Sequence, residues 1–109
     1  MASYDCYCDD VLSGKIEISK VWEDKLVLAF HHPAKSSGVH VVLIPKEHIH
    51  SILDKKATDG VLLTSMVTAI QEVANILNLD QNGFYIRLNA AGEDVTPHMH
   101  WHIRDLEPF

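Results

Sequence analysis

Histidine alternates with apolar residues near the end of this chain, in the stretch Pro-His-Met-His-Trp-His-Ile that begins at residue 97. Side chains alternate between the two faces of a β-strand, so this pattern predicts a strand over residues 98–103. One face would carry three histidines, roughly 6.5–7 Å apart along the strand, and the other would turn three apolar side chains into a core. The histidines are His98, His100 and His102, and the apolar residues are Met99, Trp101 and Ile103.

The rest of the chain contains one strong helix signal and several strand signals. Apolar residues with helical spacing, following Thr58 or Asp59 as the N-cap, predict a helix that ends near Asn78. Strands are predicted over 19–24, 26–31, 39–44 and 84–88, short helices over 9–13 and 47–54, and loops over 33–38 and 89–97. This order predicts an α+β domain with an antiparallel five-stranded sheet, one long helix and one or two short helices.

Length, charge and cysteine usage narrow the function classes. The 109 residues, 47% of them apolar, suit a single domain over 1–109 with one core. Fifteen acidic against nine basic residues give a formal net charge of −6, which disfavours nucleic-acid binding. No apolar run approaches the roughly 18 residues of a membrane span, and the acidic N-terminus does not resemble a secretory signal. Cys6 and Cys8 are too close in sequence for a good structural disulfide, so we expect a cytoplasmic protein with free thiols or a metal site.

A row of imidazoles favours nucleophilic or metal chemistry. Neutral imidazole is a nucleophile and general base near neutral pH, and crowding several rings disfavours their simultaneous protonation. One histidine could attack phosphorus while its neighbours hold oxygens or protonate the leaving group. The residues alone leave two alternatives open: a structural role, and zinc ligation by His-x-His with a further histidine.

Four stretches of the chain share the pattern of one known family. HMHWHIR, from His98 to Arg104, is similar to a motif in which three histidines alternate with apolar residues, with Arg104 in place of the last apolar one. Residues 6–31 resemble an opening with a C-x-x-C pair, a glycine-containing turn and two strands. Residues 39–49, VHVVLIPKEHI, resemble a strand ending in Ile-Pro-Lys-x-His-Ile, and Asn89 stands where that family has an asparagine. The chain therefore resembles the histidine triad (HIT) superfamily, in particular its Hint-like branch.

This resemblance implies an enzyme that hydrolyses or transfers a small-molecule nucleotide, joined through a phosphoramidate or phosphoester bond. His100 would be the nucleophile that forms a covalent nucleotidyl-histidine intermediate, with His98 and His102 as the flanking catalytic residues. The protein would be a homodimer and would require no cofactor. The implied substrate-binding residues are Asn89, Thr96, His32 and His48.

Two departures from the family pattern bear on the substrate. Nucleotide-binding members grip the ribose hydroxyls with an acidic residue after the second strand, where this chain has His32. The loop before the triad is shorter than usual and offers Thr96, Glu93 and Asp94 in place of a Gly-Gln-Ser/Thr-Val pattern. Two carboxylates would repel a phosphate if they pointed inward, so we expect a shifted substrate preference.

Zinc is a further implication of the resemblance. Some members bind it through two N-terminal cysteines, the histidine of the Pro-Lys-x-His-Ile stretch and the first triad histidine. The matching set here is Cys6, Asp9 or Cys8, His48 and His98, and the alternative is unligated thiols. A non-catalytic nucleotide- or zinc-binding protein on the same scaffold is the second functional hypothesis.

Overall fold

The computed structural model describes residues 5–33, 38–92 and 95–106. Within them, five strands form one antiparallel sheet in the order β1-β2-β3-β5-β4, which confirms the predicted fold class. The elements are a π-helical turn η1 (Tyr7–Val11), β1 (Lys20–Glu23), β2 (Val27–His31), β3 (His40–Pro45), a 3-10 turn η2 (Lys55–Thr58), α1 (Gly60–Ile76), β4 (Phe84–Leu88) and β5 (Trp101–Asp105).

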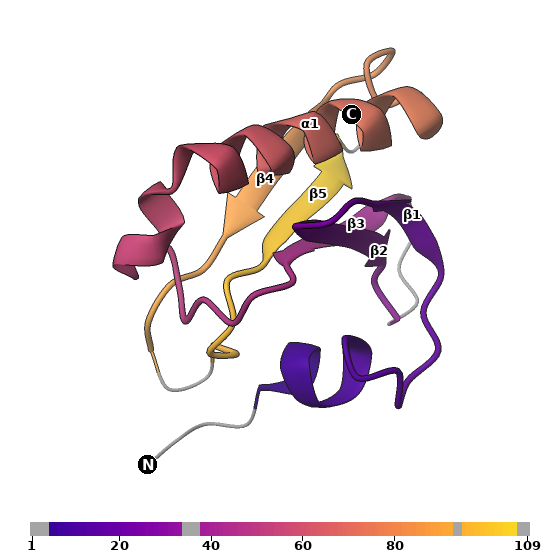
Figure 1. Cartoon of the computed structure of the whole chain (residues 1–109). Helices are drawn as coiled ribbons and strands as arrows, with labels where there is room; N and C mark the ends of the chain where they lie inside the picture. The colour runs from indigo at the N-terminus through magenta and orange to yellow at the C-terminus, as the bar shows by residue number, and fades with distance from the viewer. Residues whose placement is uncertain (1–4, 34–37, 93–94, 107–109) are drawn as a thin grey trace.

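The two faces of the sheet have different partners. α1 lies across one face, and the N-terminal turn η1 lies on the opposite side of the sheet (Figure 1). Ala29, Leu43 and Ile103 belong to the main core, with residues of α1. Phe30 and Val42, which are paired across β2 and β3, point the other way and pack with Tyr7. We call this second side the η1 face, and it is the one on which His102 lies.

Helix α1 forms where its apolar spacing predicts it. The Asp59 side chain accepts hydrogen bonds from the Val61 and Leu62 backbone N–H groups, so Asp59 is the N-cap. Leu62, Met66 and Val73 are buried, which confirms the apolar stripe. The helix ends before Asn78, whose left-handed backbone (φ 57°) reverses the chain toward β4.

Two predicted elements are wrong. The last strand begins at Trp101 and not at residue 98, because the Met99 N–H donates to the Ile49 carbonyl (2.6 Å) and so bonds to the loop after β3. That loop forms no helix over 47–54. A short helix forms later, at η2, where the Asp54 side chain caps the Lys56 N–H. Both errors have one cause, a long-range backbone contact between these two segments.

The other four predicted strands agree with the structure to within one or two residues at each end. One of them, β4, lies at an edge of the sheet. Tyr85 and Ile86 of β4 are 42% and 36% exposed. Residues 34–37 of the predicted 33–38 loop lie outside the described residues. In the part of the chain that is described, no helix combines the length and apolar character needed to cross a membrane.

Candidate functional site

The first triad histidine is completely buried and fixed by the backbone. His98 is 0% exposed, and its Nε2 lies 2.8 Å from the Pro45 carbonyl oxygen at the end of β3. A carbonyl can only accept, so Nε2 carries the proton and donates. In the neutral ring, Nδ1 therefore holds a lone pair. His98 thus acts as a structural tie whose other nitrogen faces the N-terminal turn.

His100 has one nitrogen anchored and the other available. Its Nδ1 donates to the His98 carbonyl oxygen at 2.7 Å, which leaves the lone pair on Nε2. Within the described residues Nε2 has no hydrogen-bond partner. The Tyr7 ring packs 5.0 Å from the His100 ring, and burial raises the pKa of the Tyr7 hydroxyl. An imidazole held in this tautomer presents Nε2 as a nucleophile.

The third triad histidine belongs to a row of imidazoles on the η1 face. His102 Nδ1 lies 2.8 Å from His40 Nε2, so one of the two nitrogens donates and the other accepts. The His32 ring stacks on His40, with centroids 4.3 Å apart and planes 6° from parallel. At the other end, the rings of His100 and His102 meet edge to face at 5.1 Å. This is closer than the strand spacing predicts, because His100 precedes β5 and does not follow strand geometry.

Two imidazoles of this row, those of His40 and His102, are kept neutral at pH 7. Burial lowers the pKa of His40 to about 4, and the nearby His32 and Arg104 lower it further. Burial likewise lowers the pKa of His102 to about 4, reinforced by the neighbouring histidines and Arg87. No carboxylate contributes to either shift. The row therefore forms in a locally positive environment.

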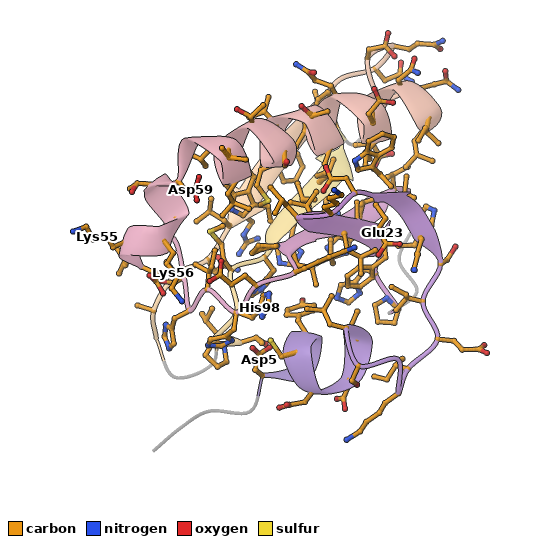
Figure 2. All side chains as sticks on the ribbon, viewed as in Figure 1. Asp5, Glu23, Lys55, Lys56, Asp59 and His98 are labelled. Carbon is orange, nitrogen blue, oxygen red and sulfur yellow. The ribbon has the colours of Figure 1, made fainter. Side chains whose placement is uncertain are left out.

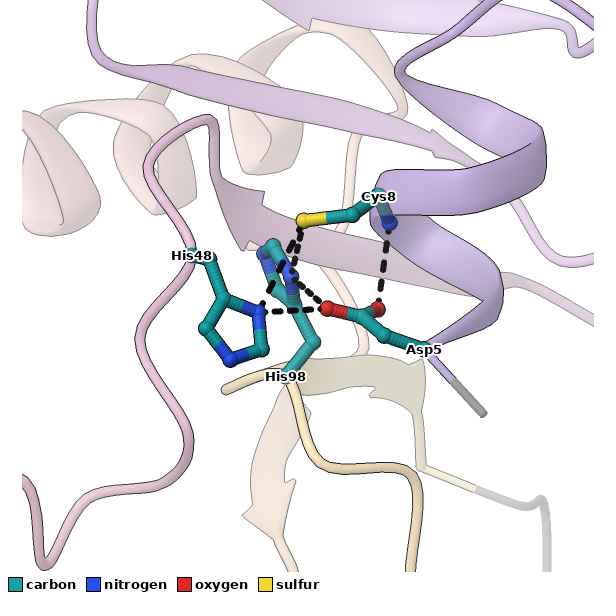
Figure 3. Close-up of side chains that lie close together, drawn as sticks. All are labelled: Asp5, Cys8, His48 and His98. Atoms are coloured by element: carbon teal, nitrogen blue, oxygen red, sulfur yellow. Dashed lines mark hydrogen bonds and ion pairs between the residues drawn. The ribbon is translucent and has the colours of Figure 1, made fainter. Parts of the chain in front are cut away.

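A second cluster lies on the other side of His98. Asp5 and Cys8 from the N-terminal turn, His48 from the loop after β3, and His98 point toward one another (Figure 3). Asp5 Oδ2 is 2.6 Å from His48 Nδ1 and 3.0 Å from His98 Nδ1, and Cys8 Sγ is 3.3 Å from the same His98 nitrogen. All four ligand atoms lie within 4.8 Å of one another.

The protons of this cluster do not satisfy its lone pairs. His98 Nε2 already donates to Pro45, so the neutral ring turns a lone pair toward the Asp5 carboxylate, which can only accept. Burial alone would raise the pKa of Asp5, but the hydrogen bond from the Cys8 N–H and the nearby His98 ring outweigh it and lower the pKa to about 2. A cation between Asp5 Oδ2 and His98 Nδ1, whether a proton or a metal ion, resolves this conflict. Four N, O and S donors that all lie within 4.8 Å of one another can also surround a tetrahedral ion with bonds of about 2.0–2.3 Å.

The structure gathers only part of the predicted zinc set. Cys8, His48 and His98 come together, but Asp5 completes the group. The Cys6 thiol hydrogen-bonds Thr96, and Asp9 is exposed. The cause is the turn itself: Asp5 Oδ1 accepts from the Tyr7 and Cys8 N–H groups, which places an Asp-x-x-Cys pair where the sequence match placed Cys-x-x-Asp.

Two other residues predicted for the site, Asn89 and Thr96, form no hydrogen bond with the His100 ring within the described part of the chain. Asn89 is exposed immediately after β4. Thr96 contacts Cys6 through its side chain, and the Thr96 carbonyl accepts a hydrogen bond from the His98 N–H. Glu93 and Asp94 lie outside the described residues. The sequence analysis missed Asp5 and Tyr7. It left His40 out of the predicted site, although strand alternation puts His40, two residues before Val42, on the η1 face.

A hollow of about 450 Å³ lies at the β1–β2 end of the η1 face. Its lining combines the apolar Val11, Leu12, Ile18 and Leu28 with the charged Glu17, Lys20 and Glu23. Phe30 packs with the apolar part of this lining. The sheet therefore carries a recess of mixed polarity at one end of this face and the row of histidines toward the other.

The chain is similar to known proteins over most of its length. The sequence model of the HIT domain family matches residues 13–105. A Helicobacter pylori protein named only as an uncharacterized HIT-like protein is 31% identical over 98 residues, covering 87% of this chain and 90% of the relative. A histidine triad protein from Clostridium difficile superposes with a TM-score of 0.81 at 28% identity, over 100% of this chain and 96% of that one. A HIT family hydrolase from Legionella pneumophila also gives 0.81 at 28% identity, over 94% and 92%.

Acidification from pH 7 to 5 should lower the free energy of unfolding, and His40→Gln should weaken that dependence. The folded-state pKa of His40 and of His102 is about 4, below the unfolded value of about 6.5. The unfolded chain therefore takes up protons first as the pH falls through 6.5, and stability is lost progressively down to pH 4. After solvent screening, we expect a loss of about 1 kcal/mol per histidine at pH 5.

Urea denaturation at both pH values, followed by tryptophan fluorescence, measures this effect. Leu53→Gln is the control, because Leu53 is 76% exposed and carries no titratable group. Equal pH dependence in wild type and His40→Gln would contradict a neutral, buried His40.

Proposed function

The chain belongs to the HIT domain family, and from that membership we propose that it hydrolyses or transfers nucleotides joined through phosphoramidate or phosphoester bonds. The observation that carries the proposal is the tautomer of His100, whose Nδ1 is bonded to a backbone carbonyl and whose Nε2 has no hydrogen-bond partner among the described residues. The shared fold with a HIT family hydrolase supports it.

The proposed reaction has two displacement steps. Nε2 of His100 attacks phosphorus, the P–N bond to His100 forms, and the bond from phosphorus to the leaving group breaks. The leaving group keeps the bonding electron pair and takes a proton. Water then attacks phosphorus, the bond to His100 breaks, and the nucleoside monophosphate is released with Nε2 regenerated.

The neighbouring histidines orient this chemistry. The His98 carbonyl fixes the His100 ring, and the His98 ring holds that carbonyl in place through Pro45. His102 is bonded through Nδ1 to His40, so its Nε2 is the nitrogen left for a phosphate oxygen or the leaving group. A donor positioned in advance costs no reorganisation during the reaction.

The nucleoside is proposed to lie in the hollow beside Leu28, with its base against the apolar part of the lining and its sugar toward His32. An imidazole cannot accept two hydroxyl hydrogens at once, as a carboxylate can. His32 is moreover stacked on His40. We therefore propose that the ribose is held less firmly than it would be by an acidic residue, and that recognition depends on other parts of the substrate.

We also propose a zinc site formed by Asp5, Cys8, His48 and His98. The converging lone pairs described above support it. A bound Zn²⁺ would supply positive charge and hold the N-terminal turn against His98. A zinc-binding protein without catalysis is the second candidate function that this cluster favours.

His100→Ala should abolish turnover, because it removes the proposed nucleophile, and kcat/KM should fall by about 10⁴-fold or more. Hydrolysis of adenosine 5′-phosphoramidate carrying a neutral amine measures this, with AMP release as the readout. His50→Ala, at an exposed loop position, is the control. Turnover retained by a folded His100→Ala protein would refute the mechanism. A wild-type protein stabilised by zinc but inactive would favour the second function.

Zinc should stabilise the wild-type protein but not Cys8→Ser or His48→Ala. At a free concentration 100 times Kd, binding to the folded state adds about 2.7 kcal/mol, which thermal denaturation detects. Cys6→Ser is the matched control, because Cys6 lies outside the cluster and should keep the response. Loss of the zinc response in Cys6→Ser and not in Cys8→Ser would show that the ligand set is wrong.

A homodimer joined through the β4 edge is also proposed. An edge strand has unpaired backbone N–H and C=O groups, and Ile86 there is partly exposed on the side of α1. Sedimentation of the wild type as a dimer and of Ile86→Lys as a monomer is expected. Leu53→Lys, on an exposed loop, should remain dimeric. A monomeric wild type at working concentrations would exclude the dimer.

A further inference from the structure

Both arginines of the chain lie on the η1 face, on neighbouring strands. The sequence has only Arg87 and Arg104, the other seven basic residues being lysines. Arg87 on β4 is directly opposite His102 on β5. Arg104 on β5 is directly opposite His40 on β3. Residues paired in this way point to the same side of an antiparallel sheet, so both arginines extend the row of imidazoles.

Neither guanidinium is neutralised within the part of the chain that the structure describes. No ion pair or side-chain hydrogen bond joins Arg87 or Arg104 to another described residue. The strand positions that face the same way on β2 to β5 carry no carboxylate. They are Leu28, Phe30, His40, Val42, Ile44, Tyr85, Arg87, His102 and Arg104. The lowered pKa values of His40 and His102 agree with an uncompensated positive surface.

A positive surface of this kind is unusual for this molecule. The whole chain has a formal net charge of −6. Guanidinium groups bind carboxylates and phosphates through two parallel hydrogen bonds, which a lysine cannot do. Two arginines that have no ion-pair partner among the described residues, beside the neutral imidazoles of His40 and His102, therefore suit an anion.

The strand order places these arginines relative to the substrate. The hollow lies at the β1–β2 end of the sheet, and the triad lies before and on β5. Strand β4, with Arg87, lies beyond β5 on the far side from the hollow. With its nucleoside in the hollow and its phosphorus at His100, a substrate would extend its leaving group over β5 and β4. Arg87 remains available there even if the β4 edge is paired, because side chains stand out of the plane of the sheet.

We propose that Arg87 and Arg104 form a subsite for a leaving group that carries its own anion, a carboxylate or a phosphate. This rests on the proposed function. When the bond from phosphorus to nitrogen or oxygen breaks, the departing atom keeps the electron pair and takes a proton from solvent. The anion of the leaving group stays paired with the guanidiniums through this step. The two arginines are thus specificity-determining residues.

Three adenosine 5′-phosphoramidates that share one type of P–N bond test the proposal. Their amines are propylamine (neutral), β-alanine (a carboxylate) and 2-aminoethyl phosphate. Wild-type protein should show a higher kcat/KM for the two charged compounds than for the neutral one. Arg87→Gln and Arg104→Gln should each reduce this preference about five- to tenfold, as expected for loss of a charge-assisted contact. Comparison of the two charged compounds shows which anion the site prefers.

Lys55→Gln is the matched control. It removes the same charge from η2, where Lys55 points away from the molecule and lies well apart from His98 (Figure 2). It should leave the preference unchanged. Raising the salt concentration should reduce the wild-type preference, because ions screen exposed charges.

The outcomes separate this proposal from the proposed function. Hydrolysis of all three compounds without a preference, or with a preference that the arginine variants retain, overturns the subsite alone. Absence of hydrolysis by the wild-type protein contradicts the proposed function. In that case, calorimetry measures the affinity of His100→Ala for the same three compounds, and tighter binding of the two charged compounds supports the subsite. Equal loss of affinity for AMP in the arginine variants would assign the guanidiniums to the transferred nucleotide and overturn the proposal.

Discussion

The hydrogen bond from His98 Nε2 to the Pro45 carbonyl determines most of the site. It is fully buried, where an unpaired polar group would be costly, so the His98 ring can hardly rotate. With that ring fixed, Nδ1 of His98 must face Asp5 and Cys8. The backbone carbonyl of His98 in turn faces Nδ1 of His100. The proposed nucleophile and the proposed zinc cluster therefore share one support, although they lie on different sides of it.

The two sides of His98 also differ in the charge that they favour. On the N-terminal side of His98, a carboxylate, a thiol and two imidazoles turn lone pairs toward one point, which favours a cation. Burial and the Asp5 charge raise the pKa of the Cys8 thiol to about 11, so the apo cluster gains no further negative charge from it. On the β5 side, imidazoles and guanidiniums gather without a carboxylate, which favours an anion. One short segment thus separates two sites of opposite preference.

The sequence predicts the parts of this arrangement that depend on local pattern. The turn residues 81–83 and the strand-forming residues after them identify β4, and helical spacing identifies α1 from Asp59. Prediction from the sequence fails where a contact between distant segments determines the local structure. The Met99 to Ile49 hydrogen bond removes residues 98–100 from the strand, and no periodicity reports it. The zinc set shifts because the Asp5 side chain caps the turn that follows it. The order of Cys and Asp residues alone does not reveal that geometry.

His32 and Arg104 are best understood as one change. The His32 ring lies 4.3 Å from His40, and His40 is opposite Arg104 in the strand register. A carboxylate at position 32 would raise the pKa of His40 and supply a counter-charge close to the guanidinium. With a histidine at 32, the pKa of His40 stays low and the positive charge of Arg104 is uncompensated within the described residues. In the proposed function, the residue that weakens recognition of ribose is therefore also a condition for the proposed recognition of an anion. The proposed shift of substrate selection from the sugar to the leaving group follows from this one residue.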